Sequence, residues 1–403
     1  MADVLVATQR KASSALRTLV GISIAHWLSH VHLLVLPLLF PFLKAQLGVS
    51  YVELGLAVTV FAVVSALTQV PIGYLVDHFG ARKILLIGLT IGGLSLVMLG
   101  LHLSYASLMA CAAGLGLANA VYHPSDYAIL TEHMDEARMG RAFAIHAFAG
   151  FLGFAVAPAI IAALVTASSG FGALIVSGVL GPLIALLLIA MNIPDTGGRK
   201  AGGGNAPKRN IITPALIVLT IFFMLLNLSS IGITNFGVVA LMSGYSASYS
   251  SANAALTAFL GASAVGVLAG GILADRTERH GQLAAACFAV NAAIVLMIAV
   301  VTLPSWLLLG AMTAAGFLSG VIVPSRDLLV RNAAPAGAHG RAFGIVSTGF
   351  NIGSIISPPL FGWIMDQSAP RWVFGASVIF MVLTVFLSLL TERRPQGATE
   401  TQP

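Results

Sequence analysis

The sequence predicts an all-α integral membrane protein with twelve transmembrane helices in two six-helix, pseudo-symmetric halves. Three observations support this fold class: the composition, the number of long apolar segments, and an internal repeat. Of the 403 residues, 58% are hydrophobic and only 8% are charged, whereas a soluble domain carries about 25% charged residues. A water-soluble fold of this length could not cover its surface with so few charges.

The apolar segments are long enough to cross a bilayer, which takes roughly 20 residues of helix. The first six cover residues 18–43, 53–76, 83–103, 105–130, 140–165 and 171–193. The second six cover residues 212–241, 250–274, 281–303, 305–330, 341–365 and 372–391. The stretch between the two sets is rich in Gly and Lys and has no apolar face. We therefore expect six-helix bundles at 1–193 and 212–403, joined by a cytoplasmic linker at 194–211.

The positions of the basic residues predict the orientation in the membrane, because Lys and Arg accumulate on the cytoplasmic side. If both termini are cytoplasmic, all of the 20 Lys and Arg residues except Lys44 and Arg371 fall on that side. The net charge of +6 is then a topology signal. Because the basic residues form no continuous face, we expect no nucleic-acid partner. We expect a multi-pass monomer in the plasma membrane, which in a bacterium is the inner membrane.

The two halves share an internal repeat at a constant offset of 200, in which residues 123–160 align without gaps on residues 323–360. The identical pairs are Pro124 with Pro324, Ser125 with Ser325, Gly153 with Gly353, Pro158 with Pro358, and the Gly-Arg-Ala-Phe runs that begin at Gly140 and Gly340. A weaker echo places Asp77 opposite Asp275. Parallel repeats of six helices are typical of one class of secondary transporters.

The segment GYLVDHFGARK, from Gly73 to Lys83, resembles the loop motif between helices two and three of the major facilitator superfamily. The resemblance extends over the whole chain through the helix count, the linker and a degenerate second copy of the motif at 270–281. It implies a transporter rather than an enzyme, with a small-molecule substrate site between the halves and alternating access to it.

In that superfamily the loop motif latches the two halves together on the cytoplasmic side. Glycines in the motif permit close packing and a tight turn, and its Asp can meet a helix N-terminus or nearby Arg groups. The mixed-sign loop after the fourth span would complete the latch, although a solvated charge run is the alternative. The residues to which the resemblance assigns this role are Gly73, Asp77, Gly80, Arg82, Glu136, Arg141, Asp275, Arg279 and Arg341.

Two further segments indicate a branch of the superfamily. The stretch Tyr122-His123-Pro124-Ser125, followed by Gly140-Arg141, resembles the branch that contains fosmidomycin-resistance exporters. The stretch from Gly153 to Pro158 resembles a degraded antiporter motif, and generic helix packing is an equal alternative. These resemblances imply proton-coupled efflux of a small organic solute.

Other functions are weighed against efflux. Proton-coupled import of an organic acid is the alternative, since Arg326 and the histidines could bind a carboxylate. A membrane-embedded enzyme is a remote alternative, because no paired nucleophile and base stand on a clear motif. No ATP-binding loop of the GxxxxGK[ST] kind is present, so we expect no cofactor and infer coupling to an ion gradient.

Ionisable residues inside membrane spans are costly and mark function by default. His26 and His30 lie one turn apart on the first span, and an imidazole with an unperturbed pKa near 6.5 can exchange protons at physiological pH. For each single His, hydrogen-bonded packing is the alternative. The predicted proton-coupling and cavity residues are His26, His30, His123, Asp126, His146, Arg326 and Asp327.

Three amides complete the predicted site, because Asn227, Asn235 and Asn351 could orient a substrate or bond a neighbouring helix. The spacing of His26, His30 and His32 could also suggest a metal site. The third His points about 120° away from the first on a helix, and no Cys or Glu joins them. We therefore expect no metal.

Overall fold

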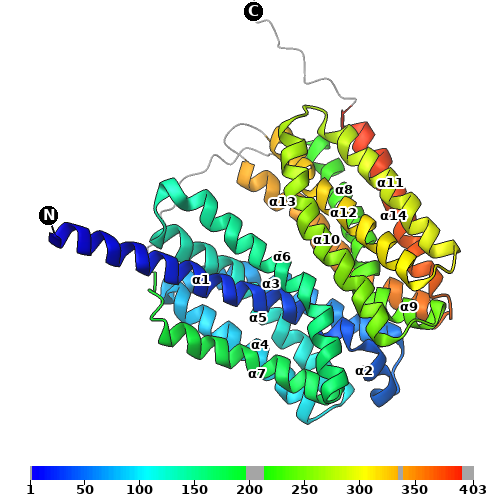
Figure 1. Cartoon of the computed structure of the whole chain (residues 1–403), viewed down its shortest axis with the longest axis horizontal. Coiled ribbons are helices and arrows are strands. Elements are labelled where there is room, and N and C mark those ends of the chain that lie inside the picture. Colours follow the sequence, from blue (N-terminus) through cyan, green and yellow to red (C-terminus); the bar gives the residue numbers. More distant parts are fainter. Residues whose placement is uncertain (1, 197–212, 335–338, 393–403) are drawn as a thin grey trace, which may run out of the picture. The chain divides into compact units, whose positions relative to one another are not determined.

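The computed structural model describes residues 2–196, 213–334 and 339–392, all of whose regular elements are helices (Figure 1). Eleven helices of the described part are long and apolar enough to cross a membrane. The chain divides into two compact units, Met1–Ala206 and Pro207–Pro403. The predicted all-α membrane fold is therefore confirmed, and each unit is described by itself below.

The first unit contains six long helices and two short ones. They are α1 (Ala2–Leu38), α2 (Phe40–Leu47), α3 (Tyr51–Phe79), α4 (Ala81–Leu101), α5 (Tyr105–His133), the 3-10 turn η1 (Glu136–Arg138), α6 (Met139–Ala167) and α7 (Gly170–Ala190). The first predicted span, 18–43, is divided after α1. A proline follows at the start of α2, where its missing N–H costs nothing.

The second unit repeats the arrangement with one interruption. Its helices are α8 (Pro214–Ile231), the π turn η2 (Gly232–Phe236), α9 (Gly237–Tyr245), α10 (Tyr249–Asp275), α11 (His280–Val300), α12 (Ser305–Ala333), α13 (His339–Asp366) and α14 (Arg371–Glu392). The predicted span 212–241 is thus one path broken by a π turn. Such turns are rare and often lie at functional sites.

Hydroxyl residues at the helix starts explain several element boundaries. Ser50 accepts a hydrogen bond from the backbone of Glu53, whose side chain accepts one back, which makes a capping box at the start of α3. Ser104, Ser169 and Thr213 accept the same bond at the starts of α5, α7 and α8. These caps satisfy backbone N–H groups that a helix start otherwise leaves unpaired.

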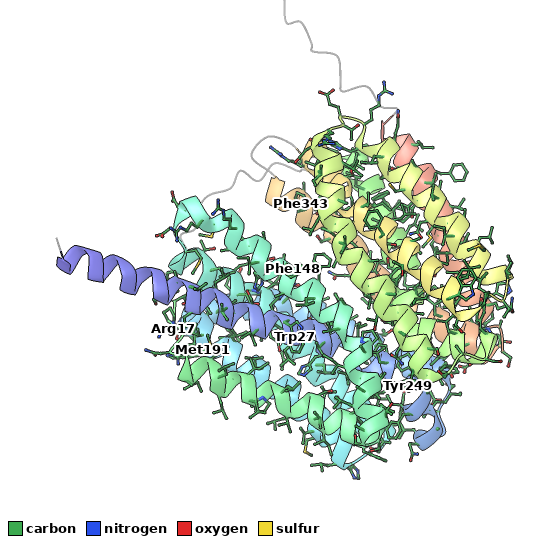
Figure 2. All side chains as sticks on the ribbon, in the orientation of Figure 1. Arg17, Trp27, Phe148, Met191, Tyr249 and Phe343 are labelled. Carbon is green, nitrogen blue, oxygen red and sulfur yellow. The ribbon has the colours of Figure 1, made fainter. Side chains whose placement is uncertain are left out.

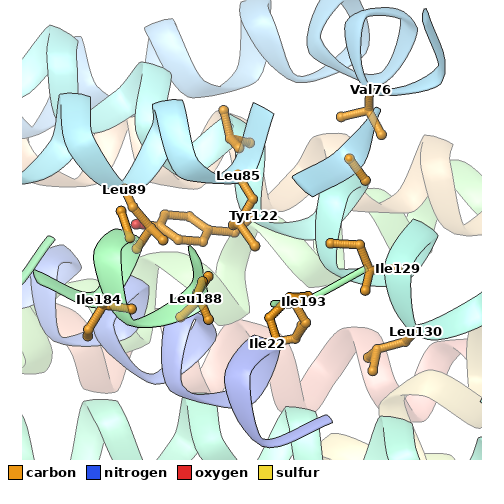
Figure 3. Packing of buried hydrophobic residues seen from close by; sticks show 14 of the residues in the cluster. Ile22, Val76, Leu85, Leu89, Tyr122, Ile129, Leu130, Ile184, Leu188 and Ile193 are labelled. Carbon is orange, nitrogen blue, oxygen red and sulfur yellow. The ribbon is translucent and has the colours of Figure 1, made fainter. Parts of the chain in front are cut away.

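The interior of the first unit is apolar and closely packed. Figure 3 shows Leu85 and Leu89 of α4, Tyr122 of α5 and Leu188 of α7 within one buried cluster. Glycine makes the α4 and α7 approach possible, because a Cβ on Gly93 would lie 2.3 Å from the Gly178 carbonyl oxygen. Small residues at helix contacts are the usual way to pack helices in lipid.

The outer surfaces are also apolar, as the side chains in Figure 2 show. Trp306, Leu67 and Leu268 are among the large hydrophobic residues that are exposed. Exposed apolar surface of this extent would aggregate a soluble protein. It fits a chain whose outer faces meet lipid.

Candidate functional site

The structure brings five of the predicted residues into one buried cluster in the first unit, which we call the His–Asp cluster. Its members are His26 and His30 on α1, His123 and Asp126 on α5, and His146 on α6. The His26 Nδ1 atom lies 3.5 Å from Asp126 Oδ2, and His146 Nε2 lies 3.6 Å from the same oxygen. The carboxylate is therefore flanked by imidazoles from two other helices.

The imidazole rings of the cluster also contact one another. The His26 and His146 rings are stacked with centroids 3.9 Å apart. The His30 and His123 rings lie 4.6 Å and 5.3 Å from the His26 ring. His26 is thus the centre of the group. At these distances, a positive charge on one ring disfavours protonation of the neighbouring rings.

Glycines of α6 make room for these rings. A Cβ on Gly150 would lie 2.8 Å from His26 Nε2 and 2.9 Å from His30 Nε2. A Cβ on Gly153 would lie 2.4 Å from the Trp27 carbonyl oxygen. The α6 glycines therefore let α1 come close with two histidines in the contact, which gives the antiporter-like segment a definite packing role.

The polar atoms of the cluster lack hydrogen bonds. Both carboxylate oxygens of Asp126 are buried without a hydrogen-bond partner, as are His26 Nδ1 and both ring nitrogens of His146. The Asp126 side chain is 0% exposed. A buried charge without partners costs several kcal/mol or more, so the cluster requires a bound proton or another cation.

The same atoms have the composition of a metal site. One ligand atom each from His26, Asp126 and His146 lie within 4.8 Å of one another. Imidazole nitrogen and carboxylate oxygen are common ligands of Zn²⁺. His32, which the spacing also suggested, instead lies with Nε2 2.9 Å from the Ser177 carbonyl oxygen of α7 and takes no part.

The second unit carries the two predicted charged residues of α12, Arg326 and Asp327, which pair with each other. Arg326 Nε donates a 2.8 Å hydrogen bond to Asp327 Oδ1. The Arg326 Cζ atom lies 5.0 Å from the Phe223 ring centroid and 5.2 Å from that of Phe350. The guanidinium is thus packed on aromatic rings from α8 and α13, two residues that the sequence interpretation missed.

The three predicted amides lie in different surroundings. Asn227 Nδ2 donates a 3.3 Å hydrogen bond to Ser354 Oγ, which joins α8 to α13. Asn235 lies in the π turn, where its Oδ1 accepts a hydrogen bond from Thr234. Asn351 is exposed on α13. Among the described residues, only Asn227 of these three amides makes a hydrogen bond to another helix.

The loop between α3 and α4 is held by a residue that the sequence interpretation did not single out. Asp195 Oδ1 accepts a 3.0 Å hydrogen bond from the Arg82 backbone, and Thr196 Oγ1 accepts one from Ala81. The carbonyl of the same aspartate lies 3.2 Å from His133 Nε2 at the end of α5. A carboxylate directly after the sixth span was the available signal.

Glycine is required at the same loop. Gly80 has φ +97°, and a Cβ there would lie 2.5 Å from Asp195. The tight turn expected of Gly80 is therefore present. A Cβ on Gly73 would meet nothing within 4 Å apart from its own helix backbone, so within the first unit this residue makes no close contact with another described helix.

The other latch residues lie at the surface of their own units. Asp77, Glu136 and Arg141 are exposed, and Asp77 makes no hydrogen bond or ion pair with any described residue. Asp275 and Arg279 are likewise exposed. Arg341 lies in the first turn of α13, with its side chain outside the described part, and most of the expected linker 194–211 lies outside the described residues.

Comparison with known proteins adds a second line of evidence to the fold. The sequence profile of the Major Facilitator Superfamily matches residues 22–237 and 217–402. The chain belongs to the Major Facilitator Superfamily. Together with the transporter names of its relatives, this makes it a membrane transporter of small solutes and not an enzyme.

Relatives within the superfamily extend the comparison. The chain is 26% identical over 281 residues to the fosmidomycin resistance protein of Escherichia coli strain K12, which covers 68% of each chain. It is 26% identical over 376 residues to a probable sulfoacetate transporter of Cupriavidus necator, covering 83% of this chain and 85% of the relative. The predicted resemblance to the fosmidomycin-resistance branch is thus confirmed.

A solved structure shows the same superfamily fold. The inward-facing bacterial homologue of the human lysosomal transporter Spinster aligns with a TM-score of 0.81 at 14% identity, covering 94% of this chain and 97% of that one. In the present protein, the fourth long helix of each unit, α5 or α12, is 29 residues long and carries a charged group. Asp126 and Arg326 both lie seven residues before the end of that helix.

Proposed function

We propose that this superfamily member is a proton-coupled secondary transporter that exports a small organic solute. The observation that carries the proposal is the His–Asp cluster, in which both Asp126 carboxylate oxygens and at least one nitrogen of each of four imidazoles are buried without a hydrogen bond to a described residue. A transporter needs a site whose protonation alters its conformational equilibrium. Titratable groups shared between three helices meet that need.

The groups facing Asp126 come from every helix that contributes to the cluster. His26 faces it from α1 and His146 from α6, and His30 contacts the His26 ring from the same helix α1. His123 and Tyr127 lie on its own helix, where their rings are 5.6 Å apart. A proton taken up here changes the attraction between α1, α5 and α6, and thereby biases the protein toward one access state.

The direction and the solute rest on the relatives. The relative named for fosmidomycin resistance supports export, in line with the proposal. Import of an organic acid is the second candidate, favoured by Arg326 on α12 and by the relative named for sulfoacetate. Fosmidomycin and sulfoacetate are accordingly the first solutes to test.

The proposal also covers the location of the protein, its orientation in the membrane and the contact between its halves. We place the protein in the plasma membrane, the inner membrane of a bacterium, as a monomer with both termini cytoplasmic. Asp77 and Arg82, with Asp275 and Arg279 in the second half, would form the cytoplasmic latch between the halves. Asp77, Asp275 and Arg279 are exposed within their units, which leaves their charges available for such a contact, whereas Arg82 is half-buried.

The test is flux in proteoliposomes that contain only this protein. A pH-sensitive dye inside the vesicles reports proton movement when fosmidomycin or sulfoacetate is added, and the labelled solute reports its own movement. We expect solute flux to follow an imposed pH gradient and protons to move with it. Solute flux that does not depend on the pH gradient would contradict proton coupling. If the flux does depend on it, the direction of solute movement relative to that of protons distinguishes export from import.

A divalent metal at the cluster is the competing explanation, and the same vesicles decide it. With protons as the coupling ion, flux is unchanged by a metal chelator such as EDTA. If the three metal-compatible groups need an ion instead, the chelator abolishes flux and Zn²⁺ restores it. The second outcome would overturn the proton assignment.

A further inference from the structure

The guanidinium of Arg326 has most of its hydrogen-bonding capacity unused. Its Nε donates to Asp327, while Nη1 and Nη2 donate to no described residue. A guanidinium carries five N–H donors in a fixed fork. The terminal fork, which can bind a carboxylate, sulfonate or phosphonate through two parallel hydrogen bonds, is therefore free.

The ion pair with Asp327 does not explain Arg326 as a residue that holds two helices together. The two residues are neighbours on α12, so their bond joins no second helix to it. The Asp327 side chain is 44% exposed, compared with 18% for Arg326. The carboxylate is therefore the more exposed partner and orients the guanidinium through Nε, while Nη1 and Nη2 stay available to a ligand.

Aromatic rings hold the guanidinium in place. Phe223 of α8 and Phe350 of α13 contact each other edge to face, with centroids 4.9 Å apart, and Arg326 lies over both. Rings at this distance attract the cation and shield it from water on one side. A planar Arg that is already ordered loses little entropy when it binds an anion.

Polar groups follow one helical turn further along the same two helices. Asn227 lies four residues after Phe223 and Ser354 four residues after Phe350, and the two side chains are hydrogen-bonded at 3.3 Å. Four residues of helix advance about 6 Å, so this pair lies within the reach of a small solute whose charged end is on Arg326. The π turn interrupts the same path five residues beyond Asn227.

We propose that Arg326, with Asn227 and Ser354 beside it, is the substrate site of the second half, and that the transported solute is a small organic anion. The oxyanion head, whether carboxylate, sulfonate or phosphonate, accepts hydrogen bonds from Nη1 and Nη2 of Arg326. The organic part extends toward the Asn227 and Ser354 pair. This inference rests on the proposed transport function but is independent of proton coupling.

Binding to the purified protein in detergent tests the inference without flux. The probes are propionate, ethanesulfonate and ethylphosphonate, with propionamide as the uncharged counterpart of propionate, and thermal stabilisation reports binding. We expect at least one of the three anions to stabilise the protein and propionamide to have no effect. Loss of the charge-assisted bonds in Arg326→Gln should weaken binding by about tenfold or more.

A matched control lies on the same helix. Arg331 is exposed five residues further along α12, so Arg331→Gln removes the same charge and should leave anion binding unchanged. Because binding is measured without flux and at constant pH, failure of this inference is distinguished from failure of proton coupling. Equal stabilisation by propionamide, or an undiminished effect of the anions in Arg326→Gln, would overturn the inference.

A chemical measurement on the unaltered protein covers the case in which Arg326→Gln does not fold. Phenylglyoxal modifies accessible guanidinium groups, and mass spectrometry resolves each modified Arg. We expect the anion that stabilises the protein to slow modification of Arg326 and to leave Arg331 unaffected. If none of the three anions protects Arg326 at millimolar concentration, the assignment is wrong.

Discussion

At the scale of single residues, the two halves carry opposite charges at equivalent positions, with different surroundings. Asp126 lies among imidazoles that can neutralise it, and Arg326 lies on aromatic rings that tolerate its charge. A carboxylate needs a cation or a proton when it is buried. A guanidinium remains charged under all physiological conditions. We therefore propose that protons are exchanged in the first half, while the second half carries a constant positive charge.

The first prediction concerns Asp126→Asn, which keeps the size of the side chain and removes its ability to release a proton. We expect solute flux driven by a pH gradient to be abolished, while exchange of solute at equal pH survives, because exchange requires binding and conformational change alone. Both are measured in the same proteoliposomes. If the aspartate is a static partner of the histidines, the variant will instead lose stability while its remaining flux keeps a normal response to the gradient.

At the scale of helices, a glycine leaves room for the side chains of the neighbouring helix. Gly150 leaves the volume that the His26 and His30 rings occupy between α1 and α6. In the second half Phe350 stands at the equivalent position of α13, and its ring supports Arg326. The same repeat position is thus a glycine beside the histidines in the first half and a phenylalanine beside Arg326 in the second.

The second prediction follows from that volume. In Gly150→Ala the new methyl group would lie within 2.9 Å of both rings, and the rings can rotate away because they are the ends of side chains. We expect the unfolding temperature to change little and pH-driven flux to fall about tenfold or more, since small displacements of a functional group have effects of this size. Gly140→Ala on the same helix, where no atom lies within 4 Å, is the control. Unaltered flux in Gly150→Ala would show that the ring positions are not critical.

The third prediction concerns the turn between α3 and α4. Gly80→Ala places a Cβ at φ +97° and against the Asp195 carboxylate, which should destabilise the protein by about 1–3 kcal/mol. Thermal unfolding in detergent measures the change. Gly73→Ala, in the same motif with no atom within 4 Å, should cost little. An equal loss in the two variants would mean that the Asp195 contact does not fix this turn.

At the scale of the whole molecule, the fourth prediction is the orientation in the membrane. A single Cys in place of Gly203, in a background lacking Cys111 and Cys287, should resist an impermeant maleimide in intact cells and react once the membrane is permeabilised. The physical reason is the accumulation of Lys and Arg on one side of the membrane. Ser168→Cys, at the exposed end of α6, should react in intact cells. Labelling of the Cys at position 203 in intact cells would reverse the topology.

The sequence by itself determined the fold class, the helix positions and the repeat. These features follow from composition and periodicity, because a bilayer requires about 20 apolar residues for each span. It also singled out all five members of the His–Asp cluster, since any ionisable residue in a span is costly enough to be noticeable. Two boundaries depended on local detail, at the division between α1 and α2 and at the π turn of Gly232–Phe236.

Only the tertiary structure decided which of these residues meet. Sequence reasoning could not show that His26 stacks on His146, because the rotation of each helix about its axis is set by packing against its neighbours. The contribution of Phe223 and Phe350 was hidden for a related reason, as apolar residues in an apolar span carry no distinguishing signal. Asp195 was hidden by its place beyond the last span of the first half, where only the folded chain brings it back to the start of α4. The residue types thus indicated the chemistry of the site, and the contacts between helices decided its geometry.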